Sequence, residues 1–159
     1  MIYHLKTIQI SVAYLDRANN KKEIIKMAAN VEMKAYKVAD ISFTNKVNGK
    51  VQLKLKNKMS HKVKYNNNDF CEATLDVEVS DPDYPDAISM KISVVGAFHV
   101  KNKIEKEFLH VETYNELFPF AKALVATISV NAGVPPIYLQ YVDISNQEIY
   151  RFDMNADKE

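Results

Sequence analysis

The chain has 159 residues, 47% hydrophobic and 26% charged, which is enough for one domain with its own core. A formal net charge of +1 and only 3 glycines disfavour a nucleic-acid or membrane partner and a glycine-rich phosphate loop. The single cysteine, Cys71, excludes an internal disulfide, and no apolar run approaches the ~20 residues of a membrane span.

The first 30 residues show no clear periodic pattern. Residues 22–29 have a helical composition, so residues 1–30 are predicted to be a partly helical N-terminal extension of a domain formed by residues 31–159. Residues 1–10 lack the basic, apolar, small order of a secretory signal. We therefore expect a cytoplasmic protein.

Four strands are predicted next in chain order. Apolar residues are spaced along residues 31–43, and they alternate with polar residues along 51–56, 73–79 and 87–100. Asn48-Gly49 is a strong turn signal, and the two prolines of residues 81–86 exclude a central strand there. Gly96 indicates a bulge or a close contact. The pattern predicts an antiparallel meander with one apolar face, in an α+β fold.

The polar face of this predicted sheet carries opposite charges on adjacent strands. Lysines fall on the second strand and carboxylates on the third, so the lysines are expected to be solvated and ion-paired rather than a nucleic-acid site. The residues are Lys54, Lys56 and Lys58 opposite Glu72, Asp76 and Glu78.

A helix is predicted from Leu117 to Ala132, with Pro119 in its first turn and Gly133 as its C-terminal cap. Its only charged residue is Lys122, so it is apolar on more than one side. One side is therefore expected to contact another subunit or to bind an apolar ligand. The predicted oligomer-interface side consists of Leu117, Ala121, Leu124 and Ile128.

The sequence contains no recognisable catalytic motif. No His-Glu-x-x-His, Gly-x-Ser-x-Gly, Walker or Rossmann pattern occurs, and Cys71 has no partner in the sequence that would activate it. His110 and Glu112 are the nearest approach to a metal pair and are more often surface residues. We expect a protein that is not an enzyme and needs no metal or cofactor.

Two segments resemble the SecB family of protein-export chaperones. The first is Asn-Glu-Leu-Phe-Pro-Phe-Ala-Lys at residues 115–122, and the second is Ala-Gly-Val-Pro-Pro-Ile-Tyr-Leu at 132–139, followed by Val142-Asp143. Residues 39–43 are similar to the family's first strand, and residues 96–98 are similar to the end of its fourth strand. The resemblance covers residues 31–144.

The resemblance implies a four-stranded antiparallel sheet with a long helix, assembled as a dimer or a dimer of dimers. It also implies ATP-independent binding of unfolded or precursor polypeptides along apolar grooves and delivery to the translocase motor SecA. The predicted polypeptide-binding residues are Val51, Leu53, Leu55, Phe98, Phe118, Phe120, Ile137, Tyr138, Leu139 and Tyr141. The alternative for Val51, Leu53 and Leu55 is sheet core.

The chain departs from the family where SecA docks on an acidic patch. Asp40 matches one acidic position, but Thr44 and Lys91 stand where carboxylates are expected. Four interpretations therefore stay open: a general holdase, a SecB-like chaperone dedicated to one client such as a toxin–antitoxin pair, a small-ligand-binding α+β domain, and a structural oligomer.

Overall fold

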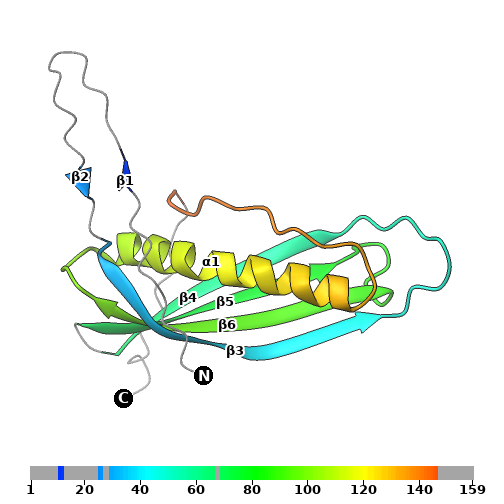
Figure 1. Cartoon of the computed structure of the whole chain (residues 1–159), viewed down its shortest axis with the longest axis horizontal. Coiled ribbons are helices and arrows are strands. Elements are labelled where there is room, and N and C mark those ends of the chain that lie inside the picture. The colour runs from blue at the N-terminus through cyan, green and yellow to red at the C-terminus, as the bar shows by residue number, and fades with distance from the viewer. Residues whose placement is uncertain (1–10, 13–24, 27–28, 67–68, 147–159) are drawn as a thin grey trace, which may run out of the picture.

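The computed structural model of the chain describes residues 11–12, 25–26, 29–66 and 69–146. Its long elements are one antiparallel sheet, in the order β3-β6-β5-β4, and one helix, α1, that lies across a single face of the sheet (Figure 1). The predicted α+β class, with four antiparallel strands and a long helix, is confirmed. The elements are β1 (Ser11–Val12), β2 (Ile25–Lys26), β3 (Val31–Asn45), β4 (Lys56–Tyr65), β5 (Phe70–Ser80), β6 (Ile88–Val100) and α1 (Lys106–Asn131).

The strand order differs from the predicted simple meander. β4, β5 and β6 follow one another as antiparallel neighbours, but β3 pairs with β6 on the far side of the sheet. The chain must therefore cross from one edge of the sheet to the other between β3 and β4. Gly49, with φ of +79°, supplies a turn within this connection and not a two-residue hairpin.

Residues 46–55, which we call the crossover segment, make this connection. The strand predicted at residues 51–56 is wrong for residues 51–55, because β4 begins only at Lys56. Lys54 donates its backbone N–H to the Asp81 carboxylate at 2.6 Å and not to a neighbouring strand. The alternating pattern thus marks an extended segment that crosses the end of the sheet.

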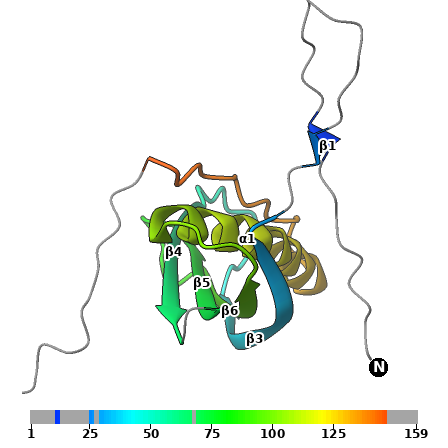
Figure 2. The same cartoon turned by 90° about the vertical axis from the view of Figure 1, so that its left-hand side faces the viewer.

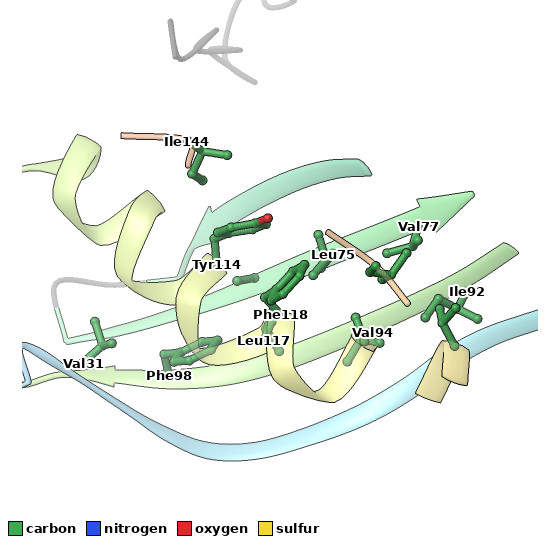
Figure 3. Close-up of a cluster of buried hydrophobic side chains, with 14 of the residues drawn as sticks. Val31, Leu75, Val77, Ile92, Val94, Phe98, Tyr114, Leu117, Phe118 and Ile144 are labelled. Carbon is green, nitrogen blue, oxygen red and sulfur yellow. The ribbon is translucent and has the colours of Figure 1, made fainter. Parts of the chain in front are cut away.

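The core lies between the sheet and α1. Alternate residues of β5 and β6 point towards the helix, from Cys71 to Val79 and from Ile88 to Phe98, and all are buried (Figure 3). Cys71 is a buried strand residue, as predicted. Gly96 provides a close contact, since a Cβ atom there would lie 2.7 Å from the Phe98 ring and 2.9 Å from the Leu117 side chain.

Helix α1 is longer than predicted. It begins at Lys106 and not at Leu117, and Pro119 lies in its interior and not in its first turn. Leu109, Thr113 and Tyr114 follow one another at helical spacing and are buried, so packing in the core extends the helix in the N-terminal direction. The predicted C-terminus is confirmed: Gly133 has φ of +77°, and its N–H and that of Val134 donate to the carbonyls of Val130 and Ser129.

Most of the predicted N-terminal extension lies outside the described residues. Within it, β1 and β2 pair in an antiparallel register that places Ser11 opposite Lys26 and Val12 opposite Ile25. The helix expected over residues 22–29 is wrong at Ile25–Lys26, which is extended.

Candidate functional site

Helix α1 buries one row of side chains against the sheet and leaves apolar residues exposed on its other side. Leu117 and Ala121 are fully buried against the sheet, so they belong to the core of this chain and the prediction that they contact another subunit is wrong. Leu124 and Ile128 are half-buried. Phe108 is 62% exposed and Val130 56%, so apolar surface remains on the helix.

Residues 134–146, which we call the return segment, run back along α1. Ile137 donates its N–H to Ser129 Oγ at 2.9 Å, and the Tyr141 hydroxyl donates to Asn115 Oδ1 at 2.8 Å. Leu139, between these two points, and Ile144, beyond them, are buried (Figure 3 labels Ile144). The segment is extended and fixed to the helix without forming a strand.

This arrangement turns three apolar side chains outward. Tyr138 is 64% exposed, Tyr141 53% and Val142 41%, and we call these three residues the return patch. The Tyr141 ring lies 5.4 Å from that of Phe118 and 5.9 Å from that of Tyr114, between ring centroids. These aromatic contacts hold the patch in place, and its exposed side is available to an apolar partner.

A second apolar surface lies on the other flank of α1, along β3. Tyr36, Val38 and Ile41 are exposed there and form what we call the edge patch. The Tyr36 ring lies 4.3 Å from that of Phe120, between centroids. A cavity of about 190 Å³ opens beside them. Figure 2 shows β3 and β4 on opposite sides of α1, so the two patches flank the helix.

The crossover segment contributes a third exposed region. Val51 is 52% exposed and Leu55 37%. Asp81, itself buried, holds this segment: one carboxylate oxygen accepts the Lys54 N–H, and the other accepts the N–H groups of Asp83 and Tyr84 at 2.8 and 3.1 Å. The Lys54 bond, followed by the other two, lowers the pKa of Asp81, so it stays ionised.

A polar contact joins β4 to the helix beneath the return segment. The Thr113 hydroxyl donates to the Leu109 carbonyl at 2.9 Å, so it accepts the Nε2–H of His61 at 3.0 Å. His61 Nδ1 is left as a buried acceptor without a partner among the described residues. Burial, with the neighbouring His110, lowers the pKa of His61 to about 4, so the ring is neutral near pH 7.

The predicted polypeptide-binding residues divide by exposure. Val51, Leu55, Tyr138 and Tyr141 are exposed, and Leu53, Phe120 and Ile137 are half-buried. Phe98, Phe118 and Leu139 are buried in the core, so they offer no surface to a partner and the prediction that they bind polypeptide is wrong for these three.

Sequence reasoning missed the edge patch and Asp81. The apolar residues spaced along 31–43 resembled a core strand, and bulges after Met33 and Val38 shift which residues are covered. An aspartate before a proline does signal a turn that accepts nearby N–H groups, but its bond to Lys54, 27 positions away, leaves no sequence signal.

The sheet face opposite α1 is polar. Asp40 is exposed there, in a hollow of about 310 Å³ that Lys58, Asp76, Glu78 and Lys91 also line. Lys91 Nζ lies 3.4 Å from Glu78 Oε1, so the lysine that replaces an expected carboxylate also pairs with a neighbouring one. Thr44 lies on the same face, opposite Ser89.

The described part of the chain offers neither a metal-binding cluster nor a membrane-spanning helix. It holds no cluster of three or more His, Cys, Asp or Glu side chains that would bind a metal ion. None of its helices is long and apolar enough to cross a membrane.

Comparison with known proteins gives two kinds of similarity. The chain is 32% identical to the protein-export protein SecB of Neorickettsia sennetsu over 87 residues, which is 48% of this chain and 53% of that protein. It is 31% identical to SecB of Roseobacter denitrificans over 68 residues, 41% of this chain and 40% of that protein. The chain thus spans about half the length of the curated relatives it matches.

A solved structure shares the fold. It is a SecB-like chaperone of Mycobacterium tuberculosis in complex with a peptide from an antitoxin, with a TM-score of 0.55 and 9% sequence identity, covering 72% of this chain and 91% of that one. The family model of the preprotein translocase subunit SecB matches residues 21–156. With the strand order, the helix and this match in agreement, the chain belongs to the SecB family.

Proposed function

We propose that the protein is a cytoplasmic chaperone of the holdase type, which binds unfolded or precursor polypeptides without ATP. Membership of the SecB family supports a chaperone role. The observation that carries the proposal is the exposed apolar surface on both flanks of α1, namely the return patch and the edge patch, together with Val51 and Leu55 of the crossover segment.

The physical argument rests on the cost of leaving this surface in water. Burial of apolar area contributes about 25 cal/mol per Å², reduced by the cost of ordering the bound chain. An unfolded client has apolar side chains scattered along an extended backbone, and three separated exposed regions suit it better than one deep pocket. Several weak contacts on one chain, or on several chains of an oligomer, then add avidity.

Oligomer formation is part of the proposal. β3 is an edge strand, and Phe108 and Val130 of α1 are exposed. An exposed strand edge and an apolar helix side are surfaces that proteins usually cover. A dimer or dimer of dimers, in which half-buried Leu124 and Ile128 lie at the margin of the contact, would cover part of them and leave the return patch open.

A dedicated client is the second candidate. The M. tuberculosis SecB-like chaperone of similar fold is bound to a peptide from an antitoxin, which supports a comparable role here. Delivery to SecA is the weaker alternative, because an acidic docking face would depend on Asp40 while Lys91 neutralises Glu78. The cavity of about 190 Å³ beside the edge patch is below the usual 300–1,000 Å³ of small-ligand sites, which favours a client side chain over a free small molecule at that place.

The test is suppression of aggregation by the full chain. A chemically denatured model protein is diluted into buffer with and without this protein, in the absence of ATP, and light scattering is followed. We expect scattering to fall as the molar ratio of the protein rises. Light scattering that is unchanged at a several-fold molar excess of this protein over the model protein would contradict the holdase proposal.

A further inference from the structure

We propose that the contact of His61 on β4 with His110 and Thr113 on α1 is an acid-sensitive latch, which releases the N-terminal half of α1 and exposes core residues to a client. The release does not depend on the proposed holdase function, whereas the gain in client binding rests on it. Three features carry the inference: two adjacent histidine rings, buried polar atoms without partners, and a second contact that can act as a hinge.

The latch joins β4 to the beginning of the helix. His61 lies opposite the buried Leu75 of β5, so its side chain is on the sheet face that α1 covers. The Nε2–H of His61 donates to the Thr113 hydroxyl at 3.0 Å, and the His61 ring lies 4.7 Å from that of His110, between centroids. Both partners belong to the N-terminal half of α1, so this contact holds that half on the sheet.

Two polar atoms in this contact are buried and have no hydrogen-bond partner among the described residues. They are His61 Nδ1 and Tyr114 Oη, and their rings lie 5.6 Å apart between centroids (Figure 3 labels Tyr114). The Val142 backbone is near the Tyr114 hydroxyl without reaching good hydrogen-bond geometry. Water supplies the missing bonds when the contact opens, so the contact stabilises the closed helix less than apolar packing would.

A proton on either ring is poorly stabilised while the latch is closed. Burial, together with the neighbouring His110, lowers the pKa of His61 to about 4, and the carbonyls of His110 and Thr74 oppose this less strongly. Glu107 lies one turn before His110, yet burial still lowers the pKa of His110, so this carboxylate does not offset the cost of charging. The groups around the two rings are Tyr114 of α1, Leu75 and the Thr74 carbonyl of β5 and, behind Tyr114, Tyr141 of the return segment.

The other flank of α1 has a contact that opening can leave intact. Asn30, just before β3, donates its side-chain N–H to Glu112 at 2.6 Å and accepts one from Asn102 at 3.1 Å. Since β3 and β4 are the two edge strands, the two contacts hold the same part of the helix from opposite sides. Glu105, the N-cap residue, makes no side-chain cap bond within the described part of the chain, so the first turn adds little resistance. We expect the helix to lift on the β4 side and to pivot at Asn30.

Opening on the β4 side uncovers part of the core beside the return patch. Leu109 and Tyr114 of α1 and Cys71 of β5 are buried members of one hydrophobic cluster. The return segment moves with the helix, because the Tyr141 hydroxyl donates to Asn115 at 2.8 Å. A client on the return patch then gains apolar contacts that the closed state does not offer, so acid should raise the affinity for unfolded polypeptide.

The release is tested by labelling the thiol of Cys71, which is buried in the closed state. With a pKa of about 4 when closed and about 6.5 when open, His61 alone raises the open fraction about thirtyfold between pH 7.5 and pH 5. The reagent is dithiodipyridine, and each rate is divided by that of a cysteine peptide at the same pH, so that ionisation of the thiol cancels. We expect about a thirtyfold rise in the wild type and about fivefold or less in His61→Gln, where only His110 still titrates. The matched control Ser60→Ala, at an exposed neighbour on β4, should keep the wild-type rise.

Low urea separates local release from global unfolding. At pH 5 the labelling rate should hardly change in low urea, because a local opening exposes little surface. A rate that climbs from the start as steeply as the global unfolding constant would overturn the latch, as would an equal rise in the wild type and His61→Gln.

The gain in client binding is measured with a permanently unfolded protein that lacks histidine. The wild type should bind it about fivefold or more tightly at pH 5 than at pH 7.5, and His61→Gln should change by about twofold or less. Equal changes in both, with Cys71 labelling still pH-dependent, would refute the gain in client binding. Absence of binding at either pH, with the labelling as expected, would support the release and contradict the proposed holdase function instead.

Discussion

The burial of His61 predicts that the folded chain loses stability at acid pH. Its pKa lies near 4 in the folded chain, against about 6.5 in an unfolded chain, because the ring is buried beside His110 and Thr113. The His61 ring is therefore protonated below about pH 6.5 in the unfolded chain but only below about pH 4 in the folded chain. Stability is fully present above pH 6.5 and falls as the pH drops between these two values.

The magnitude follows from the two pKa values. At pH 5 the unfolded chain is almost fully protonated at this ring and the folded chain is mostly neutral, so the loss is about 2 kcal/mol relative to pH 7.5. Below pH 4 it levels off near 3 kcal/mol. His110, whose pKa burial also lowers, adds a contribution of the same sign.

Urea denaturation at pH 7.5 and pH 5, at fixed protein concentration, measures this loss. His61→Gln should reduce the difference between the two pH values by about 2 kcal/mol, whatever its effect at pH 7.5. Ser60→Ala, at the exposed serine next to His61 on β4, is the control and should keep the wild-type difference. An unchanged pH dependence in His61→Gln would refute the buried, neutral assignment.

Two further predictions concern positions where the chain has little freedom. Gly96→Ala places a methyl group within 3 Å of Phe98 and Leu117, and should cost about 1–3 kcal/mol of unfolding free energy, measured by urea denaturation; no change would mean that the helix moves away freely. Asp81→Ala removes the acceptor of the Lys54 N–H, so hydrogen exchange at Lys54 should accelerate at least tenfold more than exchange in the middle of β5. Equal acceleration at both places would mean general destabilisation and no specific anchoring of the crossover segment.

The alternation of apolar and polar residues along the strands was sufficient to predict which residues of β5 and β6 form the core. In β5 and β6 every second residue is apolar and buried, because a strand with one covered face must alternate. The C-terminus of α1 was also predictable, since Gly133 and the two prolines that follow leave few other conformations. Family membership was predicted from the Leu-Phe-Pro-Phe-Ala segment and is confirmed.

The remaining features depend on contacts between distant residues. Residues 51–55 alternate like a strand, but the backbone partner of Lys54 is the Asp81 side chain, which no local pattern reveals. Pro119 suits a first turn locally, yet eleven further residues, 106–116, are helical before Leu117, because one side of them packs in the core. The burial of Leu117 and Ala121 follows from the side of α1 that faces β6, and that orientation is a tertiary property.

The central claim is that exposed apolar residues bind unfolded polypeptide. The most direct measurement is the affinity of the full chain for a permanently unfolded protein, titrated by fluorescence. Tyr138→Ser with Val142→Ser removes two exposed side chains outside the core and should weaken binding about tenfold or more. Tyr84→Ser, at an equally exposed tyrosine in the β5–β6 turn, should leave it unchanged. Equal affinity of the wild type and the double variant would contradict the account.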